Sequence, residues 1–351
     1  MLWWTWEPGA FDAVRGTFRP STFALAVACL VGYVTVGGLR FRHISHGALR
    51  LRDGVRAQLT WDFMSSVTPS AMGGAPFAAF FIARENGLAY GQVTAIMLFS
   101  MLMDQLWFAT AIVTLYVAAV WVPVFPTSLG AAGVGTVAMY LGGMLVYIAF
   151  FAYATLVRPE LIERVARFVV RWKPLRRFEG RVAHEARKLR RQARVLRSQP
   201  AGFYLRGAAY TALYWLGRYG ILLFVALSFT RDLRPVLVLL RTAGLWLAGL
   251  IMPTPGGSGG IEGLFVLFIA PLLPDGYGGP VLLAWRLLAY YLLLVAGLFV
   301  AGRAVRSLLS GETPPADAAL DLPDTGPDDD EPDAVPLADA PGPALGSARA
   351  R

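Results

Sequence analysis

The sequence is poor in charged residues, cysteine and histidine. Only 16% of its 351 residues are Asp, Glu, Lys or Arg, whereas soluble domains carry about 25%. The single cysteine, Cys29, excludes an internal disulfide framework and a cysteine-based metal cluster. A P-loop motif for nucleotide phosphates is also missing. Because 56% of the residues are hydrophobic, we expect an all-α, polytopic integral membrane protein with no metal or other cofactor.

Two short motifs fit enzyme signatures only in part. GGSGG at 256–260 matches the G-x-S-x-G nucleophile elbow, but no histidine follows Ser258 and the flanking segments are apolar. His43 and His46 lack the H-E-x-x-H spacing of a zinc helix. We therefore do not expect an enzyme, although a membrane-embedded lipid-modifying enzyme remains an alternative.

The net charge of +9 conceals two segments of opposite sign. Residues 158–199 contain fourteen Lys or Arg and four Glu, and residues 310–351 contain ten Asp or Glu and two Arg. Between membrane spans, a basic loop is explained better by the positive-inside rule than by nucleic-acid binding. Its first part fits an amphipathic helix on an anionic leaflet or a solvated helical hairpin. The acidic, proline-rich tail is expected to be disordered.

Five segments are long and apolar enough to cross a bilayer, namely 21–39, 91–122, 131–157, 203–230 and 281–302. They predict a membrane domain over 21–309 that includes a basic cytoplasmic loop at 158–200. The arginines of 40–56 place that loop in the cytoplasm as well. Residues 1–20 should then lie outside the cytoplasm and the C-terminus within it, in a multi-pass protein of the cell membrane.

Two further apolar stretches, 57–83 and 236–273, are broken by glycine and proline. Both breaks read T-P-x-x-x-G-G, and the second contains two additional glycines. We interpret them as re-entrant hairpins that enter from opposite sides and form an inverted repeat, as in transporters with a midplane binding site. Small residues that only allow close helix packing are the alternative. The backbone positions concerned are Thr68, Pro69, Gly73, Gly74, Thr254, Pro255, Gly256, Gly257, Gly259 and Gly260.

Charged residues in or beside the apolar runs are the candidate binding residues: Asp104, Arg218, Arg241, Glu262 and Arg286. Each would cost about 2.5 kcal/mol or more if it faced lipid at the bilayer centre. We expect Glu262 to pair with Arg286 and Asp104 with Arg218, while Arg241 has snorkelling to the interface as an alternative.

Arginines beside opened helix ends suit an anionic group. Ion pairs that only hold the bundle together are the structural alternative. Three roles stay open for Glu262: stabilising a helix start, accepting a proton, or pairing with a cationic headgroup.

These residues resemble a family, the transmembrane flippase-like domain of lysylphosphatidylglycerol synthases and its stand-alone relatives. The resemblance covers roughly residues 20–305. It rests on three features. The first is the motif P-G-G-x-G-x-x-E, with an arginine in the helix that follows. The second is a P-x-x-x-G segment followed by a helix that carries an acidic residue, and the third is a first helix that ends in arginine. The matching positions are Pro255, Gly256, Gly257, Gly259, Glu262, Arg286, Pro69, Gly73, Asp104, Leu39 and Arg40.

The first hairpin departs from the family pattern, because Ala75, Pro76 and Phe77 follow Gly74 and the next arginine is Arg84. Aminoacyl transfer is not expected, since the soluble synthase domain is absent. The resemblance implies a flippase that moves an anionic or aminoacylated phospholipid, or a polyprenyl-phosphate-linked lipid, between leaflets. Membrane lipids are the expected partners. The alternative is a non-transporting partner of a soluble or membrane enzyme of envelope biosynthesis.

Overall fold

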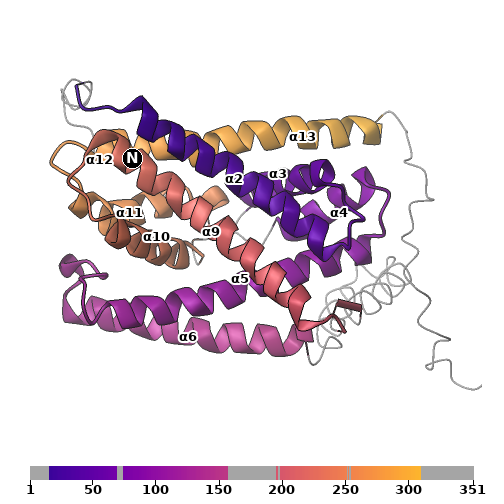
Figure 1. The fold of residues 1–351 in the computed structure, drawn as a ribbon, viewed down its shortest axis with the longest axis horizontal. Helices are drawn as coiled ribbons and strands as arrows, with labels where there is room; N and C mark the ends of the chain where they lie inside the picture. Colours follow the sequence, from indigo (N-terminus) through magenta and orange to yellow (C-terminus); the bar gives the residue numbers. More distant parts are fainter. Residues whose placement is uncertain are drawn as a thin grey trace, which may run out of the picture. The chain divides into compact units, whose positions relative to one another are not determined.

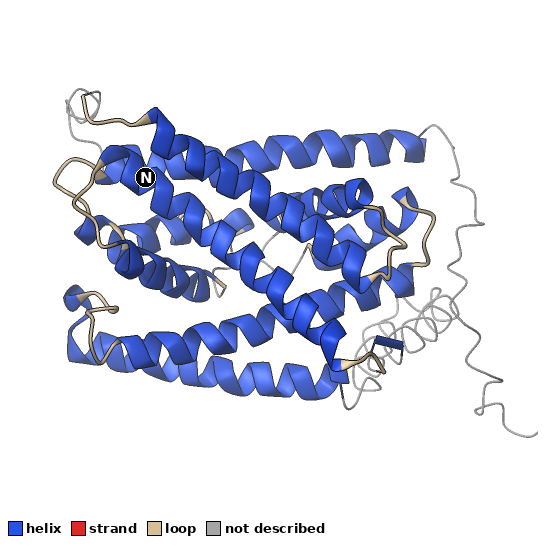
Figure 2. Ribbon diagram, viewed as in Figure 1, coloured by secondary structure: helices blue, strands red, loops and turns tan. Residues whose placement is uncertain are grey.

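The computed structural model describes residues 16–68, 74–156, 195–196, 198–250, 252 and 254–309. Most of the basic loop, the acidic tail, and the hairpin residues Pro69 and Gly73 lie outside the described residues. Throughout the described ranges, every regular element is a helix (Figures 1 and 2). Six helical segments there are long and apolar enough to cross a membrane. The predicted fold class, a polytopic all-α membrane protein, is confirmed.

The first half of the membrane domain consists of a long helix, two shorter helices and two further long helices. The break between the two shorter ones falls at the first T-P-x-x-x-G-G. The elements are α2 (Pro20–Ile44), α3 (Leu51–Val67), α4 (Ala75–Glu85), α5 (Tyr90–Ala118), the 3-10 turn η2 (Thr127–Leu129) and α6 (Gly130–Leu156).

The second half repeats the sequence of a long helix, a broken pair and a long helix. Its elements are α9 (Ala201–Phe229), α10 (Pro235–Gly249), the 3-10 turn η4 (Pro255–Gly257), α11 (Gly260–Phe268), the 3-10 turn η5 (Ala270–Leu272), α12 (Gly278–Arg286), the π-helix η6 (Leu287–Tyr291) and α13 (Leu292–Leu309). Proline starts both α2 and α10, where its missing N–H has no helical partner to lose.

The long helices α2 and α9 pack antiparallel along their length (Figure 1). Arg19, just before α2, donates its backbone N–H to Ser228 near the end of α9, at 2.8 Å. At the other end, His43 of α2 lies 3.0 Å from the carbonyl of Phe203 in the first turn of α9. Because α3 and α4 follow α2 whereas α10 and α11 follow α9, the two broken pairs begin at opposite ends of this helix pair. Their order agrees with the predicted inverted arrangement.

Two boundaries differ from the sequence prediction. Helix α2 continues to Ile44, so Arg40 and Arg42 are helical rather than part of a loop, and Arg40 is only 1% exposed. The first hairpin begins at Leu51 instead of residue 57, because the polar first turns of α3 are helical too. In addition, Pro255–Leu272, predicted as part of the second hairpin, is long and apolar enough to count as a sixth candidate span. It is not one continuous α-helix but a 3-10 turn, a short helix and a second 3-10 turn.

Glycines let α3 approach α2 closely. A Cβ on Gly54 would lie 2.4 Å from the Gly38 carbonyl oxygen, and one on Gly38 would lie 2.7 Å from the backbone nitrogen of Val55. These distances are too short for any side chain, and backbone atoms cannot swing aside. The contact places one face of α3 against the second half of α2. It thereby positions the polar side chains that lie between α2, α3 and α9.

We expect Gly38→Ala to lower the thermal stability of the protein. The added methyl group overpacks a backbone contact, a change that costs about 1–3 kcal/mol. Gly32→Ala in the same helix is the matched control, since no atom lies within 4 Å of a Cβ there. Alanine should be neutral or slightly stabilising at position 32. Thermal unfolding in detergent measures both, and equal melting temperatures for the two variants would contradict the packing argument.

Candidate functional site

The second hairpin break is built by glycines in backbone conformations that other residues rarely adopt. Gly256, Gly257 and Gly259 have φ values of 59°, 67° and 90°. Residues with a Cβ are strained at positive φ. The backbone conformation of the break therefore requires the glycines of the P-G-G-x-G motif. The chain makes one 3-10 turn and then restarts as α11 at Gly260.

Glu262 and Arg286 form an ion pair at this break, with 2.8 Å between Oε1 and Nη2. The other carboxylate oxygen of Glu262 accepts the backbone N–H of Gly259 at 2.7 Å, which caps the start of α11. We call Gly259, Glu262, Arg286 and Tyr290 the hairpin clasp. The pairing predicted for Glu262 is confirmed, and its carboxylate does stabilise a helix start.

The clasp also includes an aromatic ring positioned by a π-helix. Arg286 lies over the Tyr290 ring at 4.3 Å from its centroid. Tyr290 belongs to η6, the π-helical turn that directly follows Arg286, and such turns occur frequently at functional sites. A Cβ on Gly256 would lie 2.3 Å from this ring, so the glycine also makes room for Tyr290.

A second group of polar side chains lies between α2, α3 and α9. Arg218 donates to the hydroxyl of Tyr33 at 2.5 Å, and Tyr33 donates to Asp62 at 2.6 Å. The Arg218 guanidinium is 3.7 Å from the other oxygen of Asp62. Gln58 donates to Asp62 at 3.1 Å and to Tyr214 at 3.3 Å. We call Tyr33, Gln58, Asp62, Tyr214 and Arg218 the central cluster.

Asp104 pairs with Arg40 at 2.5 Å rather than with Arg218, so the expected Asp104–Arg218 pair is wrong. Trp215 Nε1 donates to the same carboxylate oxygen at 2.8 Å. The Arg40 guanidinium also lies over the ring of Tyr214, 4.4 Å from its centroid. The reason for the difference is the longer α2, which carries Arg40 into the bundle.

Tryptophan rings connect the central cluster with the helix that carries the clasp arginine. Arg218 lies 4.2 Å from the centroid of the Trp246 ring. Trp246 in turn packs edge-to-face on Trp285, at 6.5 Å between centroids, and Trp285 directly precedes Arg286 in α12. Indole faces attract guanidinium groups, so Trp246 helps to hold the Arg218 side chain in place.

Arg241 holds loop carbonyls and does not snorkel. Its side chain is 5% exposed. It donates to the carbonyl of Phe268 at 3.1 Å and to that of Pro123 at 2.9 Å. This arginine therefore ties the end of α11 to the connector before α6, a structural role.

In the first hairpin, Thr68 and Gly74 serve packing and the local backbone. Thr68 ends α3 and donates its hydroxyl to the Met64 carbonyl at 2.7 Å. A Cβ on Gly74 would lie 2.4 Å from the Met64 carbonyl carbon, so only glycine allows the start of α4 to touch the end of α3. Thr254, the matching residue of the second hairpin, has a buried hydroxyl with no hydrogen-bond partner.

The charged pairs keep partial access and spare hydrogen-bonding capacity. The carboxylates of Asp62, Asp104 and Glu262 are 13%, 15% and 18% exposed. Several buried N–H groups nearby have no partner: Arg218 Nε, Arg286 Nε, Trp246 Nε1 and Trp285 Nε1. These buried donors have no hydrogen-bond acceptor within the described structure. Nowhere in the described ranges do three His, Cys, Asp or Glu side chains form a potential metal site.

Sequence reasoning missed Asp62, Tyr33 and Tyr214 and misplaced Arg40. Asp62 had a usable signal, because it is an acid inside the apolar first hairpin. The tyrosines had none, because a tyrosine in an apolar segment carries no charge that would single it out. Arg40 was assigned to a cytoplasmic loop because it follows the apolar run directly.

Comparison with known proteins gives one family and one relative. A family model described as "Lysylphosphatidylglycerol synthase TM region" matches residues 1–297. A "UPF0104 membrane protein" of Archaeoglobus fulgidus is 25% identical over 248 residues, which cover 65% of this chain and 69% of that protein. No solved structure matches the chain significantly.

Proposed function

The chain belongs to the lysylphosphatidylglycerol synthase TM region family, and we propose that it is a lipid flippase of the cell membrane. Its substrate would be an anionic or aminoacylated phospholipid, or a polyprenyl-phosphate-linked lipid. It would act as a transporter and not as an enzyme.

The observation that carries this proposal is the hairpin clasp at a break in the membrane domain. An arginine, its carboxylate partner and unpaired N–H groups occur together where α11 restarts. A buried ion pair stabilises a protein only where further hydrogen bonds satisfy its remaining polar atoms. Glu262 instead keeps 18% exposure, and Arg286 Nε has no partner.

A phosphate can take the place of a carboxylate beside an arginine, because each presents two oxygens that can accept two parallel hydrogen bonds from a guanidinium. In the proposed cycle the headgroup phosphate displaces Glu262 from Arg286, while Glu262 keeps its bond to the Gly259 N–H. Arg218 offers a second position for the phosphate. There the phosphate would displace Asp62 from Arg218, as it displaces Glu262 from Arg286 at the clasp. Asp104 balances the positive charge of Arg40 nearby. The acyl chains stay in the lipid during this exchange.

Photocrosslinking tests where the headgroup binds. The full chain would be reconstituted in nanodiscs with a phospholipid that carries a photoreactive group on its headgroup, and the labelled peptides would be mapped. We expect labelling in 254–263 and 286–291, reduced in Arg286→Gln. Labelling confined to lipid-facing side chains such as Val31 and Phe299, which are 59% and 72% exposed, would contradict the proposal.

A further inference from the structure

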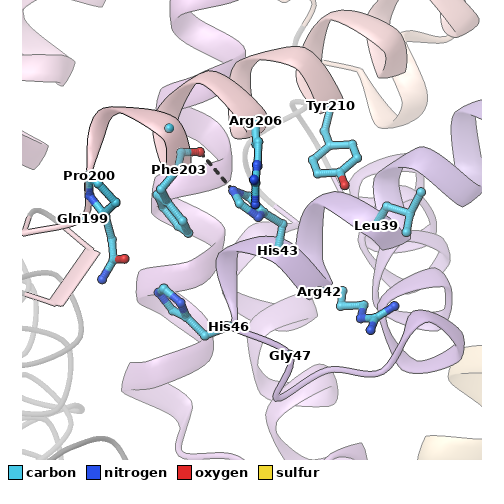
Figure 3. A pocket seen from close by; sticks show the side chains of 11 residues that line it. Leu39, Arg42, His43, His46, Gly47, Gln199, Pro200, Phe203, Arg206 and Tyr210 are labelled. Atoms are coloured by element: carbon cyan, nitrogen blue, oxygen red, sulfur yellow. Dashed lines mark hydrogen bonds between the residues drawn. The ribbon is translucent and has the colours of Figure 1, made fainter.

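A second polar site lies where α2 ends and α9 begins. The pocket has a volume of about 580 Å³ and is open on one side (Figure 3). Its charged and titratable lining consists of Arg42, His43, His46, Arg206 and Tyr210, with no acidic residue. It does not include the clasp or the central cluster, so the proposed function leaves it without a role.

Phe203 organises the histidines of this pocket. The His43 and His46 rings stack on it, with centroids 4.5 Å and 5.1 Å away. His43 Nε2 lies 3.0 Å from the Phe203 carbonyl oxygen. Since a carbonyl can only accept, Nε2 carries the proton in this hydrogen bond.

The backbone at His46 is also unusual. With φ at 52°, it is the only non-glycine residue with positive φ in the described part of the chain. Such conformations are unfavourable for an L-residue and persist when the surroundings impose them. Here the turn is fixed by the Gly47 N–H, which donates to the Arg42 carbonyl at 2.8 Å.

Helix stability does not explain the position of Arg206. Arg42 and His43 lie in the last turn of α2, where a cation is favourable. Arg206 is instead close to the start of α9, the positive end of that helix. Its side chain leans back toward this end and points into the pocket (Figure 3). Among the described residues, neither arginine has an ion-pair partner.

The start of α9 also lines the pocket, through Pro200, Gly202 and Phe203. Pro200 precedes this 29-residue helix and provides no side-chain cap. Gly202 leaves open space, with no atom within 4 Å of a Cβ. Free N–H groups at a helix start bind phosphate readily, and two arginines supply the fork geometry that phosphate oxygens match.

We infer that this pocket binds a phosphate ester, with Arg42 and Arg206 pairing with the phosphate and Tyr210 forming part of the wall against its polar substituent. The volume exceeds that of a phosphate and accommodates a small polyol. The source is either a lipid headgroup at the membrane surface or a soluble phosphodiester. The site is separate from the clasp, and its occupancy does not depend on lipid exchange.

Binding of a short-chain phosphodiester lipid tests the inference. Dioctanoyl phosphatidylglycerol keeps one negative charge across the working pH range, and it would be titrated into the full chain in zwitterionic nanodiscs. We expect about a tenfold weaker Kd in Arg206→Gln and in Arg42→Gln. Arg52→Gln is the matched control, because Arg52 is exposed in the first turn of α3 and does not line the pocket. Equal losses in all three variants, or no loss in any, would overturn the site.

Two further ligands identify the source of the phosphate. Glycerophosphoglycerol carries the headgroup without acyl chains, and dioctanoylglycerol carries the chains without phosphate. Binding of glycerophosphoglycerol at the affinity of the lipid, with the same dependence on Arg206, indicates a soluble phosphodiester. A much tighter Kd for the lipid indicates a headgroup. Binding of dioctanoylglycerol with the same dependence on Arg206 would overturn a phosphate site altogether.

The pH dependence of binding provides a second readout. Burial, together with the charge of neighbouring His43, lowers the pKa of His46 below its usual value. A bound anion favours the imidazolium, so affinity should rise as the pH falls from 7.5 toward 5.5. The other charged or titratable groups lining the pocket are Arg42 and His43 from α2 and Arg206 and Tyr210 from α9. His46→Asn tolerates positive φ and should weaken the pH dependence; an unchanged pH profile would exclude His46 from binding.

Discussion

Arg286→Gln should slow leaflet exchange of an anionic phospholipid by about tenfold to a hundredfold in a folded protein. The variant removes the guanidinium proposed to hold the phosphate at the hairpin clasp. A charge-assisted hydrogen bond is worth about 1.5–3 kcal/mol, which corresponds to that range of rates if the contact is made on the way across. Quenching of a headgroup label in proteoliposomes measures the exchange rate.

The double variant Glu262→Gln/Arg286→Gln separates transport from folding. Arg286→Gln alone leaves Glu262 without its partner, which destabilises the protein as well. Neutralising both residues removes the unpaired charge and should restore much of the melting temperature, while exchange stays slow. If the double variant recovered both stability and exchange, the pair would be a structural ion pair only.

Arg40→Gln should lower the unfolding free energy by about 3–5 kcal/mol, the usual cost of leaving one member of a buried ion pair unpaired. Arg40 is 1% exposed and makes its ion pair with Asp104, which also accepts from Trp215. The variant therefore strands a carboxylate among apolar helices. Thermal or denaturant unfolding in detergent measures the change.

The controls for this prediction use the same type of substitution. Arg52→Gln, at an exposed position of α3, should leave the melting temperature nearly unchanged. The double variant Arg40→Gln/Asp104→Asn should recover part of the loss, since it removes the stranded charge. A melting temperature for Arg40→Gln equal to that of Arg52→Gln would show that the Arg40–Asp104 pair does not stabilise the bundle.

Local sequence patterns predicted the spans, the glycine-rich break and the Glu262–Arg286 pair, but not the Tyr290 ring of the clasp. Apolar runs define the long helices, and glycine with positive φ defines the break at 256–259. Glu262 and Arg286 could be paired because each is a charge in or beside an apolar run, where facing lipid would be costly. Each of these signals depends on residues near one another in the chain or on the cost of a charge in lipid.

Contacts between distant helices were not predictable in the same way. Asp62 meets Arg218 and Tyr33 because Gly38 and Gly54 let α2 and α3 approach closely, and a single sequence does not reveal which glycines face each other. Arg40 was misplaced since the positive-inside rule counts an arginine beside an apolar run as a loop residue. In the structure α2 continues past it, and Asp104 of α5 balances its charge.

Leaflet exchange by the unmodified protein tests the central proposal most directly. Proteoliposomes would contain a headgroup-labelled lipid, assayed in turn with an anionic phospholipid, an aminoacylated phospholipid and a polyprenyl-phosphate-linked sugar, and a membrane-impermeant reagent would quench the outer leaflet. We predict quenching well beyond the outer half for at least one of these lipids, with empty liposomes stopping at half. Quenching that stops at half for all three lipids, with folded protein inserted, would contradict the flippase and favour a non-transporting partner of an envelope enzyme.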